Sequence, residues 1–295
     1  MKKLASLLLA GALSFGLLAG CGSTSGNTET PAGGNETTPV ESNAPTETGA
    51  NLEGTVIKVG ATPAPHAEIL EVVKEILAEQ GITLEIAQYN DYVQPNNAVE
   101  DGSLDANYFQ HITYMNQFNA DNGTHLVSAA EVHYEPMGLY AGKVASLEEL
   151  PDGALIGLPN DATNEGRALL VLQQEGLITL SEDAGITATI NDIVENPKNL
   201  QFSEMEAAQL PLRLADLDMA VINGNYAIDA GLSMADALAV ESAEGEAAQA
   251  YANVLAVKEG RENDPAIQAL AAALCSDEVK AYIDETYNGA VVTVF

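Results

Sequence analysis

Hydrophobic residues recur along the chain with two alternating periods from about residue 55 onward. Thr55–Ala61 is a short run rich in β-branched residues, and Ile82–Ala87 alternates apolar with polar positions, as strands do. Between them, apolar residues recur at helical spacing until Gly81, and Pro65 is predicted at the first helical position. These helix-spaced residues are Ile69, Leu70, Val73, Ile76 and Leu77. The pattern predicts a strand–helix–strand unit.

The same alternation of strand and helix returns twice more before the C-terminus. A predicted strand is followed by a predicted helix at Ala154–Leu158 and Asn164–Glu175, and again at Asp218–Ile222 and Tyr226–Gly231. Alternating units of this kind predict an α/β fold built on mostly parallel sheets with helices on both faces.

A late strand at Ala252–Val257, followed by helices at Pro265–Leu274 and Asp277–Tyr287, predicts a return of the chain to its first lobe. Two crossover segments would then join the lobes in a hinge suited to closure around a ligand. We expect them near Glu135–Tyr140 and Glu246–Val254. The predicted first lobe comprises residues 55–137 and 250–295, and the second comprises residues 138–249.

The first 20 residues have the pattern of a secretory signal. Lys2 and Lys3 precede the apolar run Leu4–Ala19, and small residues lead to Cys21. Leu18–Cys21 looks like a bacterial lipobox, which implies cleavage before Cys21 and a diacylglycerol on its thiol. An ordinary signal with an unrelated cysteine is the alternative. We expect a protein held on the extracytoplasmic side of the cell membrane by this lipid.

Composition separates residues 21–54 from the rest of the chain. This stretch is dominated by Gly, Ser, Thr, Asn, Pro, Glu and Ala, which cannot bury enough apolar surface to offset the entropy of ordering. We predict a flexible tether there. The chain carries a net charge of −32, from 11 basic and 43 acidic residues, so its surface repels nucleic acid. With only two cysteines, one of them Cys21, we expect no disulfide framework.

Arg167 is the first candidate for ligand binding. It lies in the polar stretch Asn160–Arg167, just after the predicted strand Ala154–Leu158. In open α/β sheets, ligands bind beyond the carboxyl ends of strands, where a guanidinium can hold a carboxylate through two hydrogen bonds. A surface arginine paired with an acidic side chain is an equally good interpretation of the sequence.

Asn223 and Asn225 flank Gly224 just after another predicted strand, Asp218–Ile222. Asparagine amides offer an oxygen to an ammonium group and an NH₂ group to a carboxylate. A tight turn explains the same residues, because Asn and Gly favour turn conformations. Together with Arg167, however, these amides suggest a site for a zwitterion.

Aromatic residues form a third candidate cluster, made up of Tyr92, Phe109, His111, Tyr114 and Tyr134. They could line a slot for an apolar or thioether side chain, because sulfur–ring contacts contribute about 0.3–1.5 kcal/mol each. The alternative is core packing on one helix face, since residues 108, 111 and 114 are three apart.

The sequence carries little indication of metal or catalytic chemistry. None of the four histidines forms an HxH or HxxxH pair, and a zinc site needs several convergent ligands. No GxSxG, phosphate-binding glycine loop or HExxH motif is present. We therefore expect no metal, no cofactor and no enzymatic activity.

Several longer stretches carry a resemblance to a known family. They are KVGATPAPHAEIL, DYVQPN, LDANYFQH, HYEPMGLY, PNDATNEGRALLVLQ, DIVENPKNLQF, EAAQLP and VINGNYA. In this order they cover almost all of the predicted folded body, which closely resembles the methionine-binding lipoproteins of the NlpA/MetQ type, the receptors of a methionine ABC importer. Ala64 stands where many relatives have Gly.

The resemblance implies a two-lobed periplasmic-binding-protein fold with the ligand between the lobes. It implies that Arg167 holds the ligand carboxylate, that Asn223 binds the amino-acid backbone, and that the five aromatic-cluster residues line the side-chain pocket. Asn164, Gln209 and Asn225 are further polar contacts on this view.

The function implied is capture of methionine, in its L form, and delivery to a permease and its ATPase. A methionine-containing dipeptide or another small amino acid is an alternative ligand. Alternatives from other classes are a metal-capturing lipoprotein and an adhesive or structural surface lipoprotein.

Overall fold

The computed structural model describes residues 51–242 and 250–295, so the predicted signal segment, Cys21 and nearly all of the predicted tether lie outside the described residues. The described chain builds two principal sheets, and we call each sheet with its helices a lobe. The first lobe holds a six-stranded sheet and the second a five-stranded one, while β7 (Thr179–Leu180) and β8 (Ile193–Glu195) pair separately.

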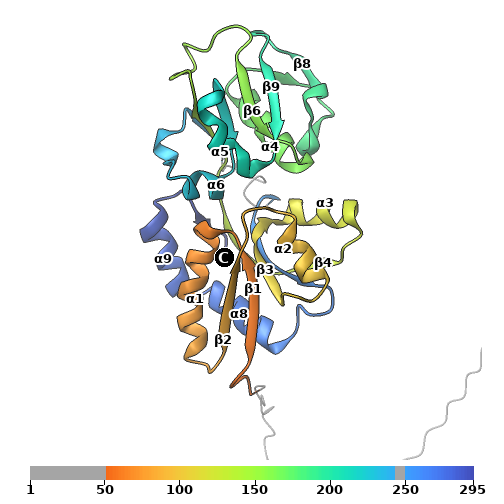
Figure 1. The fold of residues 1–295 in the computed structure, drawn as a ribbon, viewed down its shortest axis with the longest axis vertical. Coiled ribbons are helices and arrows are strands. Elements are labelled where there is room, and N and C mark those ends of the chain that lie inside the picture. Colours follow the sequence, from red (N-terminus) through yellow and green to blue (C-terminus); the bar gives the residue numbers. More distant parts are fainter. Residues whose placement is uncertain (1–50, 243–249) are drawn as a thin grey trace, which may run out of the picture. The chain divides into compact units, whose positions relative to one another are not determined.

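The sheet of the first lobe has the strand order β13-β4-β12-β3-β1-β2, and its strands β1 to β4 are labelled in Figure 1. Its strands are β1 (Val56–Ala61), β2 (Thr83–Gln88), β3 (Ala106–His111), β4 (Leu126–Tyr134), β12 (Asn253–Lys258) and β13 (Val292–Thr293). Its helices are α1 (Glu68–Ala78), α2 (Gln94–Glu100), α3 (Ile112–Asn122), α8 (Pro265–Leu274) and α9 (Asp277–Tyr287).

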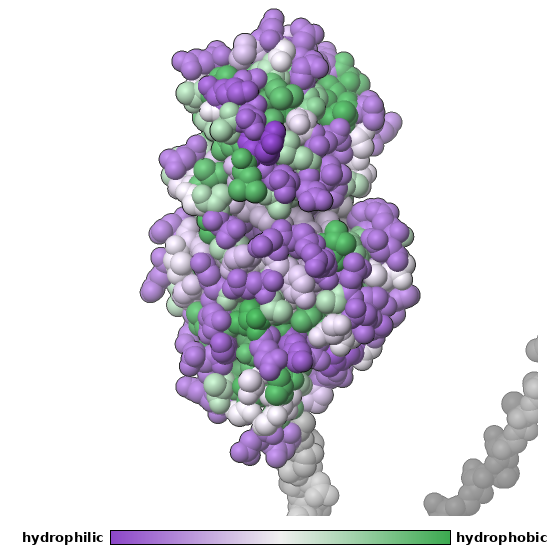
Figure 2. All heavy atoms as spheres, viewed as in Figure 1, coloured by the Kyte–Doolittle hydropathy of each residue, from purple (hydrophilic) through white to green (hydrophobic). Residues whose placement is uncertain are grey.

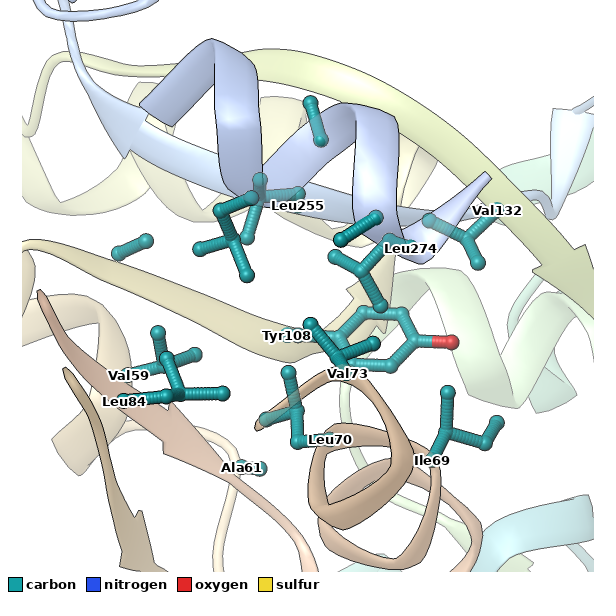
Figure 3. Packing of buried hydrophobic residues seen from close by; sticks show 14 of the residues in the cluster. Val59, Ala61, Ile69, Leu70, Val73, Leu84, Tyr108, Val132, Leu255 and Leu274 are labelled. Carbon is teal, nitrogen blue, oxygen red and sulfur yellow. The ribbon is translucent and has the colours of Figure 1, made fainter. Parts of the chain in front are cut away.

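The side chains of β12 alternate between two apolar layers, one on each face of this sheet. Leu255 and Val257 pack with α1, α8 and α9, whereas Val254 and Ala256 pack with residues of α2 and α3. Figure 3 shows part of the first of these layers, in which Leu70 and Val73 of α1 and Leu274 of α8 lie around Tyr108. The sheet is therefore covered by helices on both faces, as the alternation of strands and helices predicts.

The second lobe repeats this arrangement around the order β11-β5-β10-β6-β9. Its strands are β5 (Gly138–Ala141), β6 (Leu155–Pro159), β9 (Gln201–Met205), β10 (Met219–Ile222) and β11 (Ala239–Val240). Its helices are α4 (Ala162–Gln174), α5 (Leu210–Arg213) and α6 (Gly224–Asp229). Residues of β10 alternate between a core shared with α4 and a core shared with α5 and α6. Hydrophilic residues spread over the visible face of both lobes (Figure 2).

The two-lobed α/β architecture is confirmed, with two differences in detail. The sheets are mixed rather than mostly parallel, because β12 runs antiparallel to β3 and β4, and β10 runs antiparallel to β5. The second difference concerns Pro65, which lies before α1 in the segment Pro63–Ala67; this segment is kinked at Ala64, where the backbone is extended, and α1 itself runs from Glu68. The remaining predicted elements lie within a few residues of those observed.

The first passage of the chain between the sheets lies within the predicted segment Glu135–Tyr140. Only Glu135–Met137 separates the end of β4 in the first sheet from the start of β5 in the second. The return runs from β11 to β12 and includes residues outside the described part of the chain. The predicted residue limits of the lobes stay a prediction.

Candidate ligand pocket

A small pocket lies where the two lobes meet, with an empty volume of about 320 Å³ that includes space open to solvent. The first lobe contributes residues before α2, at the end of β3, on α3 and at the start of β12, and the second contributes the start of α4 and the Asn223–Asn225 segment. Glu135 comes from the crossover. The lining residues are Tyr92, Phe109, Gln110, His111, Tyr114, Glu135, Asn164, Arg167, Asn223, Gly224, Asn225 and Asn253.

Aromatic rings form one wall of this pocket. The Tyr92 ring lies 5.6 Å from Phe109 and 5.6 Å from Tyr114, measured between ring centroids, and stacks on Tyr226 at 4.9 Å. These separations are favourable for aromatic pairs. The alternative of one shared helix face is wrong, because Ala106–His111 is a strand and α3 starts only at Ile112. The wall is apolar and polarisable, which suits an aliphatic or thioether chain.

Arg167 projects from α4, and two of its three guanidinium nitrogens are hydrogen-bonded within the protein. Its Nε donates to both carboxylate oxygens of Glu241 at 2.8 and 2.9 Å, and its Nη2 donates to Glu241 and to the carbonyl of Glu135. Burial lowers the pKa of Arg167, but the Glu241 carboxylate outweighs burial and raises it, so the guanidinium stays charged. Its Nη1 makes no hydrogen bond with a described residue, which leaves that group to the pocket.

Asn223 and Asn225 each present one amide atom without a partner. The Asn223 amide nitrogen donates to Asn164 Oδ1 at 2.8 Å, and its Oδ1 is buried with no partner. The reverse holds for Asn225, whose Oδ1 accepts from the Tyr92 hydroxyl at 2.6 Å while its Nδ2 is buried and unpaired. Buried polar atoms are normally hydrogen-bonded, so an unpaired acceptor and an unpaired donor in one pocket indicate a ligand that supplies the opposite groups.

His111 and Asn164 connect the lobes beside these amides. His111 Nδ1 accepts from the backbone N–H of Tyr114 at 3.0 Å, so its Nε2 carries the proton and donates to Asn164 Oδ1 at 3.2 Å. Burial, assisted by the charge of Arg167, lowers the pKa of His111 to about 3. His111 is therefore a neutral donor at physiological pH.

Glu135 is a pocket residue that the sequence reasoning did not single out. Its Oε1 lies 2.7 Å from His133 Nε2 and 3.3 Å from His66 Nε2. The Nδ1 atoms of these histidines lie within hydrogen-bond distance of the Tyr108 and Thr62 hydroxyls. If both hydroxyls donate, both Nε2 atoms carry protons: His133 donates to Glu135, and His66 donates to Asn253 Oδ1 at 3.1 Å with the Glu135 carboxylate close by. Burial raises the pKa of Glu135, and His66 and Arg167 oppose that rise.

His66, His133 and Glu135 are also the cluster within the described residues whose atoms could hold a metal ion. The hydrogen bonds described above already use all three of the atoms a metal would need. We therefore interpret the cluster as the support of a buried carboxylate.

Two predicted site residues do not line the pocket. Tyr134 lies behind it, where its hydroxyl donates to Glu241 at 2.7 Å and its ring lies 5.5 Å from the Arg167 guanidinium carbon. Gln209 is exposed at the end of the short helical turn Ala207–Gln209, and it borders a separate groove with Leu212 and Asp229. The other eight predicted ligand-binding residues come together.

Glu135, Gln110, Gly224 and Asn253 are the lining residues that the prediction missed. Gln110 belongs to a buried amide network in which its Nε2 donates to Asn96 at 2.6 Å and to Asn107 at 3.0 Å. An acidic residue directly after an apolar strand was the available signal for Glu135. Asn253 carries no local signal, since the return of β12 alone brings it to the pocket.

The pocket combines three features: a cationic donor, amide atoms of both polarities beside a buried carboxylate, and an aromatic wall. Such a site fits a zwitterion with an apolar side chain, held between two lobes. The fold and the site define a two-lobed solute-binding protein.

Comparison with known proteins agrees with this class. The family model described as NlpA lipoprotein matches residues 57–295, so the chain belongs to the NlpA lipoprotein family. The methionine-binding lipoprotein MetQ of Bacillus subtilis is 42% identical over 243 residues, which are 81% of this chain and 88% of that protein.

Two solved structures are similar over the same region. A lipoprotein from Ruminococcus gnavus has 53% identity and a TM-score of 0.80, covering 82% of this chain and all of that one. A nutrient-binding protein from Burkholderia cenocepacia bound to methionine has 43% identity and a TM-score of 0.77, covering 81% of this chain and all of that one. Within the described residues, no helix combines the length and apolar character of a membrane span.

Proposed function

We propose that this chain is the substrate-binding lipoprotein of an ABC importer and that it captures methionine between its lobes without transforming it. The observation that carries the proposal is the pair of unpaired amide atoms, Asn223 Oδ1 and Asn225 Nδ2, beside Arg167 and the aromatic wall. Relatives that bear the name methionine-binding lipoprotein, and a similar structure bound to methionine, support the choice of amino acid.

Each part of methionine has a complementary group in the pocket. The carboxylate would accept from Arg167 Nη1 and Asn225 Nδ2, which are donors without another partner. The ammonium would donate to Asn223 Oδ1 and face Glu135, whose negative charge favours a cation. The thioether chain would lie against Tyr92, Phe109 and Tyr114, where sulfur–ring contacts are favourable.

Because both lobes contribute to the pocket, ligand binding and lobe closure are coupled. A ligand shifts the balance between open and closed forms only by its differential affinity for the two. Contacts from both lobes supply that difference. We propose that the closed form is presented to a membrane permease and its ATPase, and that a lipid on Cys21 holds the protein at the extracytoplasmic side of the membrane.

Calorimetry on the full chain, freed of co-purified ligand by unfolding and refolding, tests the proposal. We expect methionine to bind, and methionine amide and the 2-hydroxy analogue of methionine to bind more weakly, because each lacks one charged group. Arg167→Ala should lower methionine affinity at least tenfold, about 1.4 kcal/mol.

The outcomes separate the alternatives. Wild-type affinity in Arg167→Ala would refute the carboxylate assignment. Tighter binding of a methionine-containing dipeptide would change the ligand but keep the class. A stoichiometric metal in the purified protein would favour metal capture, and no response to any amino acid, peptide or metal would favour a structural role.

A further inference from the structure

The proposed selectivity for an ammonium group requires that Asn223 turn its oxygen, and not its nitrogen, toward the pocket. An asparagine amide has the same shape in both orientations, and only its hydrogen-bond partners decide between them. Asn223 has one such partner, Asn164 Oδ1 at 2.8 Å. The orientation of Asn164 therefore decides which atom of Asn223 faces the ligand.

Asp161 fixes Asn164 from one side. Its carboxylate caps α4 and accepts from the backbone N–H of Asn164 at 3.0 Å and from the Thr163 hydroxyl at 3.1 Å. The same carboxylate accepts from Asn164 Nδ2, at 2.9 Å to one oxygen and 3.0 Å to the other. An ionised carboxylate can only accept, so a reversed Asn164 amide would place its oxygen against two acceptor oxygens.

His111 fixes Asn164 from the other side. Its Nδ1 accepts from the Tyr114 backbone, so Nε2–H is a donor and needs an oxygen at Asn164. If the Asn164 amide were reversed, its Nδ2 would face two other donors, His111 Nε2–H and Asn223 Nδ2. Asn164 is buried, at 1% exposure, so water cannot compensate for these lost bonds.

We propose that Asp161 is a positioning residue that sets the selectivity of the pocket for an ammonium group, acting through Asn164 on Asn223. This inference rests on the proposed function. Asp161 is not among the residues that line the pocket. Because its carboxylate only accepts, it fixes the orientation of Asn164, which in turn fixes that of Asn223 and leaves Asn223 Oδ1 as an unpaired acceptor at the pocket.

Asp161→Asn is the sharpest perturbation, because it keeps the shape and the helix-capping ability of the residue but adds a donor. Asn164, and with it Asn223, can then turn over. Asp161→Ser retains a cap as well and removes the paired oxygens that hold Asn164. Asp277→Asn, at an exposed acidic position in the first turn of α9, controls for the lost negative charge.

The readout is the ratio of the dissociation constant of the 2-hydroxy analogue to that of methionine, measured by calorimetry on the full chain. We expect this ratio to fall at least fivefold in both Asp161 variants and to stay unchanged in Asp277→Asn. A purely structural role for Asp161 would weaken both ligands alike and keep the ratio. A ratio within twofold of wild type in the Asp161 variants would overturn the inference.

A second measurement needs no ligand. In NMR spectra of the ligand-free protein, the side-chain amide resonances of both Asn164 and Asn223 should shift in Asp161→Asn. A shift confined to Asn164 would refute transmission to Asn223. If wild-type protein bound no methionine at all, the proposed function would fail, while these spectra would still decide whether Asp161 orients Asn223.

Discussion

Removal of the Glu241 carboxylate should destabilise the fold strongly, because it leaves the buried Arg167 guanidinium without its anionic partner. The Arg167 and Glu241 side chains are 4% and 10% exposed. Glu241 also accepts from the Tyr134 hydroxyl at 2.7 Å and from the Met137 backbone N–H at 3.1 Å. Glu241→Ala therefore leaves a guanidinium, a hydroxyl and an amide without their acceptor. Loss of one partner of a buried ion pair costs about 3–5 kcal/mol.

Urea denaturation followed by circular dichroism measures this loss. For a domain of this size, about 3–5 kcal/mol corresponds to a fall of about 6–20 °C in melting temperature. Glu85→Ala is the matched control, since Glu85 pairs with Lys58 at 3.9 Å in an exposed position and should change stability by no more than about 0.5 kcal/mol.

A second substitution distinguishes the cost of the unpaired Arg167 charge from the cost of the packing that Glu241→Ala removes. Arg167→Leu, added to Glu241→Ala, removes the unpaired cation and should restore at least about 1 kcal/mol, because an apolar replacement of a buried ion pair is often neutral. A Glu241→Ala variant within about 1 kcal/mol of wild type would refute the reasoning, and so would the absence of any recovery in the double variant.

Three further predictions concern the pocket and its support. Tyr92→Phe removes the hydroxyl that donates to Asn225 and should weaken methionine binding by about 0.5–1.5 kcal/mol in calorimetry; unchanged affinity would contradict the role of that bond. Gly224→Ala places a Cβ 2.8 Å from the Cβ of Glu135 and should lower the free energy of unfolding by about 1–3 kcal/mol; a neutral result in urea denaturation would show that the contact relaxes freely. Burial lowers the pKa of His66 from 6.5 to about 4. Between these two pH values the ring takes up a proton in the unfolded chain but not in the folded one, so the free energy of unfolding should decrease as the pH falls from 6.5 toward 4. Titration of the folded ring near pH 6.5, followed by NMR, would contradict this.

The elements with strong local patterns could be predicted from the sequence. The predicted limits of α8 and α9 match those observed, because Pro and Asp near their starts and an apolar stripe mark them clearly. The mixed pairing of the sheets could not be predicted in the same way. Period-two alternation indicates a strand but not its direction, and the direction of β12 depends on where the chain re-enters the first lobe.

Pocket residues could be predicted where they come soon after a strand and carry a side chain suited to a ligand, such as a guanidinium or an amide. Arg167 and Asn223 met both conditions, whereas Phe109 lies within β3 and Tyr114 on α3. Glu241 did not, because an acid among many others gives no signal of its pairing with Arg167. The proposed role of Asp161 was equally hidden, since the orientation of an amide depends on contacts between distant segments.

The position of β12 has a consequence for how the protein forms. This strand lies between β3 and β4, and it belongs to the last fifth of the chain. During synthesis from the N-terminus, β3 and β4 emerge more than a hundred residues before the strand that joins them. The sheet of the first lobe thus cannot close until the whole second lobe has been made. Such long-range pairing slows folding, so the sheet of the first lobe is completed late.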